Sequence, residues 1–178
     1  GTTSYDSVVA FFKNAGKAPL YVVRIASSSA DSASLTVQDR NGTPANTLKI
    51  EGKSPGAWAN SIQVEIKDDN WLSTVPAADV NSGVETATLK SVTNLETGSF
   101  IEFDNGTAQE IVQLTGVNAD SKTVTWSGGL TNAYPAASST VKSQEFEIVV
   151  YENGFQVESW PNLSMVDTVT NFCEAVVN

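Results

Sequence analysis

The first element that the hydrophobic pattern predicts is a helix from about Thr3 to Gly16. Its apolar positions recur at helical spacing, as Tyr5, Val8, Val9 and Phe12. The next apolar run, Leu20 to Ile25, is rich in β-branched residues and is typical of a strand buried on both faces. A helix that leads directly into a buried strand indicates an α/β-type unit.

Alternating apolar and polar positions predict strands beyond residue 34. Two alternating runs, Leu35 to Gln38 and Thr47 to Ile50, flank a turn at Asn41-Gly42 and therefore predict a hairpin. A third run, from Ile62 to Ile66, places its apolar side chains on one face of a strand.

The pattern changes at about Asp68. Residues 69–143 are rich in Thr, Ser, Gly and Asn, and their apolar residues alternate in short runs without helical periodicity. Short strands at regular spacing predict a small antiparallel β-barrel. A tight turn at Asn105-Gly106 would mix the two faces of its hairpin, so we expect a bulge or a longer loop there. The candidate strands are Thr86 to Val92, Phe100 to Phe103, Glu110 to Leu114 and Lys122 to Trp126.

Strands and a helix return toward the end of the chain. Asn153-Gly154 separates two β-rich runs, Phe146 to Tyr151 and Phe155 to Trp160, which is a strong hairpin signal. From Leu163 to Val177 the apolar residues follow helical spacing, and a capping-box pattern begins at Ser164. We therefore predict a final helix.

Together these elements predict a β-rich α+β fold, in which an α/β sandwich-like domain is interrupted by an inserted small antiparallel β-barrel. The first and last segments, of about 70 and 35 residues, would each bury too little apolar surface alone. We therefore assign residues 1–68 and 144–178 to one discontinuous domain. Residues 69–143 form the inserted barrel-like domain.

Composition and charge narrow the possible functions. The chain has 178 residues, a formal net charge of −10, one cysteine and no histidine. The charge argues against sequence-independent nucleic-acid binding, because such binding relies on Lys and Arg. The lack of histidine removes Ser-His-Asp and Cys-His nucleophiles and histidine-containing zinc sites. We therefore expect neither an enzyme nor a bound cofactor or metal.

Three segments contain residue types that could bind a metal or a phosphate or act as a nucleophile, but a structural role explains each of them better. Asp68-Asp69-Asn70 has oxygen ligands for calcium but lacks the glycine and the distal glutamate of an EF-hand loop. Ser127-Gly128-Gly129 lacks the lysine and the helix start of a phosphate-binding loop. Cys173 lies on the apolar face of the predicted final helix, so we expect it to pack in the core.

Glutamates and glycosylation sequons give two further weak signals. A pair of carboxylates could serve glycoside hydrolysis, but alternation with apolar residues favours the exposed face of a strand. The sequons at Asn105 and Asn162 are short enough to occur by chance. The glutamates concerned are Glu145, Glu147, Glu152 and Glu158.

Tryptophans are the remaining candidates for a binding platform. Trp126 is expected to face the core of the β-domain, and Trp160, before Pro161 at an element boundary, to cover a core edge. Trp58 lies in residues 54–61, SPGAWANS, directly before an alternating strand. It is either a flat platform for a ligand or a peg, and because Pro55-Gly56 turns the chain and Asn60 can bond nearby backbone we favour a peg packed against the first or the last helix. The fourth candidate is Trp71.

Three segments carry motifs in a fixed order. Residues 10–25 contain Phe-Phe-Lys-Asn-Ala-Gly and then Tyr-Val-Val-Arg-Ile, residues 54–60 read SPGAWAN, and residues 151–165 end in Asn-Leu-Ser-Met. Together they resemble the FF-x-N-G-G…Y-V-V-R-V, P-G-x-W-G-N and E-x-(F/W)-x-N-L-S-M motifs of the contractile tail sheath proteins of bacteriophages and related injection particles. The resemblance covers about residues 1–67 and 144–178. The matching positions are Phe12, Asn14, Gly16, Arg24, Pro55, Gly56, Trp58, Asn60, Leu163, Ser164 and Met165.

The chain also departs from that family's pattern. Ala15 and Ala59 stand where the motifs have glycine, so the local turns must differ or shift by a residue. Members of the family are much longer, with terminal arms and a further C-terminal domain. We therefore expect this chain to correspond to a central fragment. Small β-barrels that project outward are common insertions in the family.

The resemblance implies a structural, non-enzymatic subunit that assembles around a tail tube and contracts to drive it through the cell envelope. Its partners would be other sheath subunits and, in the full-length protein, the tail tube, with no nucleic acid and no membrane insertion. Its location would be the phage tail of the virion, after assembly in the bacterial host cytoplasm. We expect the isolated fragment to be monomeric, because the arms that exchange strands between subunits lie outside it.

A second interpretation is an extracellular carbohydrate-binding or adhesin-type β-rich module that uses tryptophans as sugar platforms. The exposure of the tryptophans distinguishes the two interpretations. Acrylamide should quench at least two tryptophans in a binding module, and should largely fail to reach Trp58 and Trp126 in a sheath domain.

Overall fold

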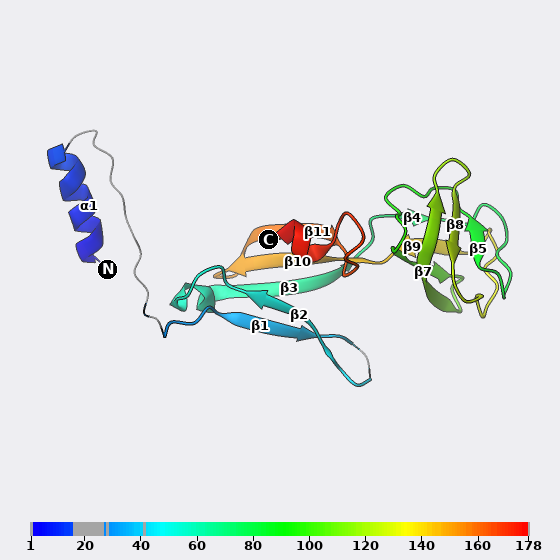
Figure 1. Cartoon of the computed structure of the whole chain (residues 1–178), viewed down its shortest axis with the longest axis horizontal. Helices are drawn as coiled ribbons and strands as arrows, with labels where there is room; N and C mark the ends of the chain where they lie inside the picture. The colour runs from blue at the N-terminus through cyan, green and yellow to red at the C-terminus, as the bar shows by residue number, and fades with distance from the viewer. Residues whose placement is uncertain (1, 16–26, 28, 41, 178) are drawn as a thin grey trace. The chain divides into compact units, whose positions relative to one another are not determined.

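The computed structural model describes residues 2–15, 27, 29–40 and 42–177 (Figure 1). The chain forms two compact units, one that ends at Asn60 and one that begins at Ser61. All the strand ladders in the described residues are antiparallel, and strands outweigh helices. The predicted β-rich fold class is therefore confirmed.

The first unit contains a helix and a hairpin. Helix α1 (Thr2–Ala15) confirms the predicted N-terminal helix. Strands β1 (Ser34–Gln38) and β2 (Asn46–Glu51) form the predicted hairpin. A short 3-10 helix, η1 (Ala57–Ser61), follows. The predicted strand at residues 20–25 lies outside the described residues.

The second unit contains a three-stranded sheet in the order β11-β10-β3. Its strands are β3 (Ile62–Asp69), β10 (Glu145–Glu152) and β11 (Phe155–Leu163). Asn153 and Gly154 join β10 to β11 with φ angles of 51° and 83°. Positive φ at both residues is what a two-residue type I′ hairpin turn requires, so this predicted hairpin is confirmed.

The two faces of this sheet differ in polarity. Along β3 the apolar residues Ile62, Val64 and Ile66 are half-buried, whereas Gln63 and Glu65 between them are exposed. The register places Ile66 opposite Ile148 of β10, on the same apolar face. The predicted one-sided pattern of β3 is confirmed, and the opposite face is polar.

A six-stranded sheet occupies the part of the second unit between β3 and β10. Its order is β4-β9-β6-β7-β8-β5, so the ladders leave it open instead of closing it into the predicted barrel. Only a single bridge, Pro76 to Leu89, connects the segments that follow its two edge strands. The strands are β4 (Ser73–Thr74), β5 (Thr86–Thr88), β6 (Phe100–Asp104), β7 (Gln109–Asn118), β8 (Thr123–Trp126) and β9 (Thr140–Ser143).

Strand β5 is shorter than the predicted strand from Thr86 to Val92. Lys90 N still donates to Val75 O over 3.0 Å, but from Ser91 on side chains take over the bonding of the backbone, since Ser91 N donates to Thr74 Oγ1 over 3.1 Å. The Ser91 hydroxyl then accepts from Thr93 N over 3.3 Å. Such side-chain bonds compete with a strand ladder, so the last residues of the predicted strand, 91–92, lie outside one.

The hydrophobic core of the second unit lies within the six-stranded sheet. Phe103 is fully buried, and its ring lies 5.4 Å from the rings of both Trp126 and Tyr134. The hairpin that carries Phe103 pairs Asp104 with Gln109, so its loop spans residues 105–108. The predicted longer loop is confirmed, and it keeps the apolar residues of β6 on the core face.

The final helix is much shorter than predicted. Helix α2 covers only Cys173–Val177, because β11 continues to Leu163 and residues 164–172 form an irregular turn. Ser164 begins this turn as a bridge partner of Phe172, and its hydroxyl accepts from Val166 N over 3.1 Å. The β-branched run at residues 168–170 also disfavours a helix. The predicted helix from Leu163 to Val177 is therefore wrong over its first ten residues.

The chain leaves the three-stranded sheet after Asp69 and returns to it at Glu145. All strands of the six-stranded sheet lie between these two residues. The assignment of residues 1–68 and 144–178 to one discontinuous domain stays a prediction, and so does the separate domain at residues 69–143.

Candidate functional site

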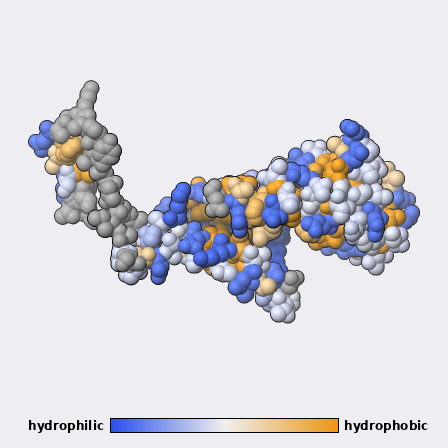
Figure 2. Space-filling model, viewed as in Figure 1, coloured by the Kyte–Doolittle hydropathy of each residue, from blue (hydrophilic) through white to orange (hydrophobic). Residues whose placement is uncertain are grey.

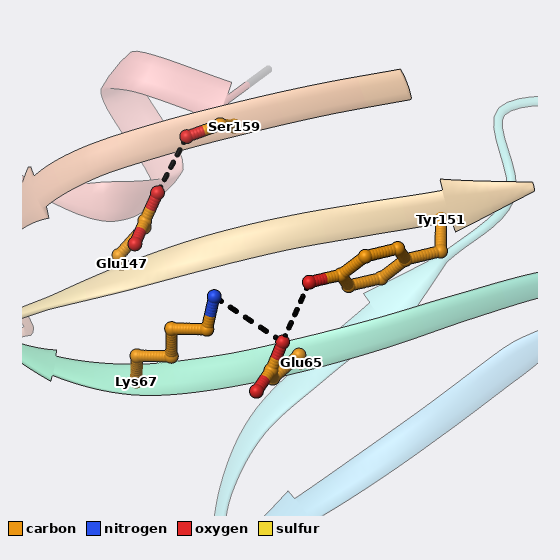
Figure 3. Close-up of polar contacts among 5 residues, drawn as sticks. All are labelled: Glu65, Lys67, Glu147, Tyr151 and Ser159. Carbon is orange, nitrogen blue, oxygen red and sulfur yellow. Dashed lines mark hydrogen bonds and ion pairs between the residues drawn. The ribbon is translucent and has the colours of Figure 1, made fainter. Parts of the chain in front are cut away.

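Five polar side chains lie across the polar face of the three-stranded sheet (Figure 3). Tyr151 on β10 donates its hydroxyl hydrogen to Glu65 Oε2 on β3 over 2.8 Å. The Lys67 ammonium lies 3.3 Å from the same oxygen. Ser159 on β11 donates to Glu147 Oε1 on β10 over 2.6 Å. These contacts link all three strands through their side chains.

The hydrogen bonds of this polar group set its protonation. The bond from Tyr151 is the main cause that lowers the pKa of Glu65. In return, the bond to Glu65 raises the pKa of Tyr151 and of Lys67. At neutral pH the phenol and the ammonium therefore keep their protons, and neither acts as a general base.

Val149 lies at the centre of the polar face. The register places it opposite Glu65 on β3 and Ser159 on β11, and it is fully buried. Val149 is therefore shielded from solvent, although it shares this face with the polar side chains. The side-chain bonds of this face connect neighbouring strands and so stabilise the sheet.

A second polar group lies at the end of strand β7. Glu110 accepts hydrogen bonds from Thr131 N and Asn132 N, both over 2.7 Å, and from Asn132 Nδ2 and the Tyr134 hydroxyl, both over 2.9 Å. Burial by itself raises the pKa of Glu110, but these four bonds outweigh it and lower the pKa to about 2. Because all the donors belong to residues 131–134, Glu110 fixes this segment against the sheet.

The predicted calcium candidate carries structural hydrogen bonds. Asp69 Oδ1 accepts from Asn70 N over 2.9 Å, and Oδ2 accepts from Asn162 N over the same distance. Asn162 has a φ of 56°, so this bond supports an unfavourable backbone conformation in β11. Within the described part of the chain, no group of three or more His, Cys, Asp or Glu side chains could hold a metal ion.

The four glutamates considered for glycoside hydrolysis have separate environments. Glu147 bonds Ser159, while Glu152 and Glu158 are exposed, as expected of a strand's wet face. The same expectation is wrong for Glu145, which is only 9% exposed because it lies where β9 passes into β10.

Two surface depressions lie on the part of the second unit that contains the six-stranded sheet. One is lined by residues 78–81, 84 and 86–88, and the other by residues 90–95 with Ala119 and Lys122. Neither lining includes two carboxylates, so neither matches the paired acids of a glycosidase.

Trp58 lies against its own segment of the first unit. Its Nε1 donates to Ser54 O over 3.1 Å, and its ring packs on Gly52. Gly56, two residues earlier, has a φ of 138°, which favours glycine. The residue is still 45% exposed, more than a packed peg would be. Its packing against a helix stays a prediction.

The other tryptophans differ in exposure. Trp126 is 3% exposed and confirms the predicted core position, whereas Trp71 is 38% exposed. Trp160 is half-buried within β11 and not at an element boundary, because the strand continues through Pro161 to Leu163. At Trp160 the predicted boundary is therefore wrong.

The family-motif positions of the first unit are mostly accessible. Phe12 is 49% exposed on α1, and Asn14 Nδ2 donates to Ala10 O over 2.8 Å. Pro55 is half-buried and Asn60 is exposed. Gly16 and Arg24 lie outside the described residues.

The motif positions of the second unit gather at the end of β11. Leu163 and Ser164 are buried, and Ser164 O accepts from Cys173 N over 2.9 Å. Met165 is 43% exposed, with its sulfur 3.7 Å from the sulfur of Cys173. Burial raises the pKa of the Cys173 thiol, and the predicted core position of this residue is confirmed.

The glycine-rich loop and the first sequon have structural partners too. Gly128 N donates to Glu85 Oε1 over 3.0 Å, so a carboxylate of the chain itself meets this loop. The Asn105 side chain accepts from Thr107 N and Ala108 N within its own hairpin loop.

Sequence reasoning missed the role of Glu110, although a signal was present. Glu110 shares the inward face of β7 with Val112 and Leu114. A charged residue on an apolar strand face requires partners, so its hydrogen-bonded environment could have been predicted. Glu145 carried a weaker signal, since its burial depends on how the two sheets meet.

Large hydrophobic residues are also exposed on the second unit. Phe155 and Val157 on the edge strand β11 are 77% and 51% exposed, and Ile111 on β7 is 56% exposed. Figure 2 shows hydrophobic areas on this unit interspersed with hydrophilic residues.

Among the described residues, no helix is long and apolar enough to cross a membrane. Comparisons of the chain with protein-family models, with curated proteins and with solved structures found no match. The family resemblance therefore rests on the motifs of the sequence.

Proposed function

We propose that this chain is a segment of a contractile tail sheath subunit of a phage or phage-like particle. In this role it assembles with other subunits around a tail tube and contracts to drive the tube through a cell envelope. The proposal needs no bond-making chemistry from the chain. It places the protein in the phage tail, assembled in the host cytoplasm, with other sheath subunits and the tube as partners.

The pairing of β3 with β10 is the observation that best supports this proposal. Strand β3 follows the SPGAWAN motif, and β10 opens the hairpin that leads into the Asn-Leu-Ser-Met motif. The two strands pair along their whole length, from Ile62 opposite Glu152 to Asp69 opposite Glu145. Two motifs that are far apart in the sequence therefore belong to one sheet, as expected of a domain with an insertion.

The inserted domain at residues 69–143 belongs to the same proposal. The six strands of the second sheet lie within it, and the Pro76 to Leu89 bridge joins its edge segments. Two backbone bonds flank this bridge, Ala77 N to Thr88 O over 2.8 Å and Lys90 N to Val75 O over 3.0 Å. The ladders leave this sheet open, and in a sheath the insertion would project outward from the domain formed by residues 1–68 and 144–178.

The test compares this chain with the full-length gene product. By electron microscopy, the full-length protein should polymerise into tubes. If the proposal holds, the 178-residue chain should stay monomeric in light scattering at high concentration, because the strand-exchanging arms of a sheath subunit would lie outside it. A stable ring or tube from this chain alone would contradict the assignment of the arms. A secretion signal on a monomeric full-length product would contradict the function itself.

The exposed indoles of Trp58 and Trp71 favour one other candidate, an extracellular carbohydrate-binding or adhesin-type module. A glycan array tests it with the wild-type chain and with Trp58→Ala and Trp71→Ala. Binding that either substitution removes, with the fold retained, would support this candidate. If the wild-type chain binds no glycan, the candidate fails.

A further inference from the structure

The two sheets of the second unit meet where the chain crosses between them. It crosses once between Asp69 and Ser73, and again between Ser143 and Glu145. The crossings lie side by side, because Asp69 pairs with Glu145 and Ser73 pairs with Lys142.

One carboxylate oxygen of Glu145 accepts a hydrogen bond from each of the two crossings. Glu145 Oε2 accepts from Trp71 N over 2.8 Å on the first crossing and from Ser143 Oγ over 2.6 Å on the second. Ser143 Oγ in turn accepts from Leu72 N over 2.7 Å. Glu145 is 9% exposed and Ser143 only 1%, so this network is shielded from water.

The charged neighbour of Glu145 is another carboxylate. Asp69 faces it from β3, and the hydrogen bonds from Asn70 N and Asn162 N hold Asp69 in place. The first crossing and β9 contribute backbone amides and the Ser143 hydroxyl, which do not titrate. Burial is the main cause that raises the pKa of Glu145; the bonds from Ser143 and Trp71 lower it, and the Asp69 charge raises it further.

We infer that the charge on Glu145 controls how firmly the two crossings are held together. We call this junction an acid-tightened lock. It is closed most firmly when Glu145 is neutral, and it loosens when Glu145 ionises opposite Asp69. The order follows from linkage, since a group that binds its proton more tightly in the closed form stabilises that form as the pH falls. For each unit by which the closed form raises the pKa of Glu145, the two crossings separate about tenfold more often at a pH above the titration of Glu145 than at a pH below it. The inference does not depend on the proposed function.

A second attachment keeps the opening local. Thr170 N and its hydroxyl both donate to the Glu96 carboxylate, over 3.2 and 2.5 Å, and so tie the turn after β11 to the inserted segment. Gly98 packs closely on Val166, Thr168 and Val169 of the same turn. The two parts thus have two attachments, and the charge on Glu145 controls only the local opening at the crossings.

Amide hydrogen exchange of Trp71 and Leu72, followed by NMR across pH, tests the lock. Glu145→Gln is the informative variant, because both donors bond the same oxygen and a glutamine carbonyl can accept both. After correction for intrinsic exchange, wild-type protection of these amides should fall as the pH rises through the titration of Glu145. Protection in the variant should stay constant, and at pH 7 it should exceed that of the wild type by about tenfold per unit of raised pKa.

Glu147→Gln is the matched control, since it removes the same charge two residues along the same strand. This control should keep the wild-type pH dependence. The inference is overturned if Glu145→Gln keeps that dependence or if Glu147→Gln abolishes it. Should Glu145→Gln fail to fold, the carboxyl ¹³C resonance of Glu145 in the wild-type chain decides. A midpoint above the ordinary glutamate value of about 4.3 supports the lock, and one at or below it refutes the lock.

Discussion

Replacing Glu110 by glutamine should destabilise the chain at neutral pH and reduce its sensitivity to acid. The four hydrogen bonds to Glu110 hold its pKa at about 2, more than two units below an ordinary glutamate. Taken in full, this shift is worth about 3 kcal/mol. The side chain keeps some contact with water, so screening reduces the expected effect to about 1–2 kcal/mol.

The pH dependence of the Glu110 effect has a defined sign. A carboxyl with a lowered pKa contributes stability above its unfolded value, near 4.3, and loses it as the pH falls toward 2. Glutamine keeps one acceptor oxygen but sets an amide group against Thr131 N, which donates to Oε2 in the wild type. The variant should therefore be less stable at pH 7, and the difference should shrink between pH 4.3 and about 2.

Urea unfolding at several pH values, followed by the fluorescence of the four tryptophans, of which Trp126 is buried, measures this difference. Glu102→Gln on the neighbouring strand β6 is the control for removal of one negative charge. The reasoning is refuted if Glu110→Gln matches the wild type at pH 7. It is also refuted if the two proteins lose stability in parallel below pH 4.3.

Three further substitutions or probes test the packing. Phe103→Ala should lower the free energy of unfolding by about 3–5 kcal/mol in urea titrations, because the fully buried ring packs against both Trp126 and Tyr134; a loss below about 1 kcal/mol would contradict this core. Gly98→Ala should lower the melting temperature, because a Cβ would lie 2.9 Å from Thr168 Oγ1 and because φ is 100° at this position. An unchanged melting temperature would show that the turn after β11 is not packed on Gly98. Cys173 should react slowly with a thiol reagent at pH 8 and rapidly in denaturant, because burial raises the pKa of the thiol and shields the sulfur from the reagent. A fast reaction in the native protein would mean that α2 is not docked.

Local patterns predicted the elements whose form depends on neighbouring residues. Asn153-Gly154 fixed a hairpin, because two adjacent positive φ angles suit only a few residue types. The alternation along β3 and the core position of Trp126 followed from strand periodicity. The inward face of β7 could likewise have revealed Glu110.

Features that depend on distant contacts were harder to predict. Helical spacing after Leu163 was real, but the bridge from Ser164 to Phe172 and the bonds from Thr170 to Glu96 hold residues 164–172 in a turn. Glu145 alternates with apolar residues, as an exposed strand residue does, and its burial arises only where two sheets meet. The barrel was expected from strand spacing, whereas closure depends on a ladder between β4 and β5 that is reduced to one bridge.

The most direct test of the sheath proposal is immunogold labelling of intact contractile particles from the source organism, with antibodies raised against the 178-residue chain. A subunit stacked in rings predicts gold particles along the whole length of the tail. It also predicts that the number of gold particles increases with tail length, and that labelling persists after contraction. Labelling confined to the tip or fibres, or found only on the cell surface, would contradict the proposal and favour an adhesin.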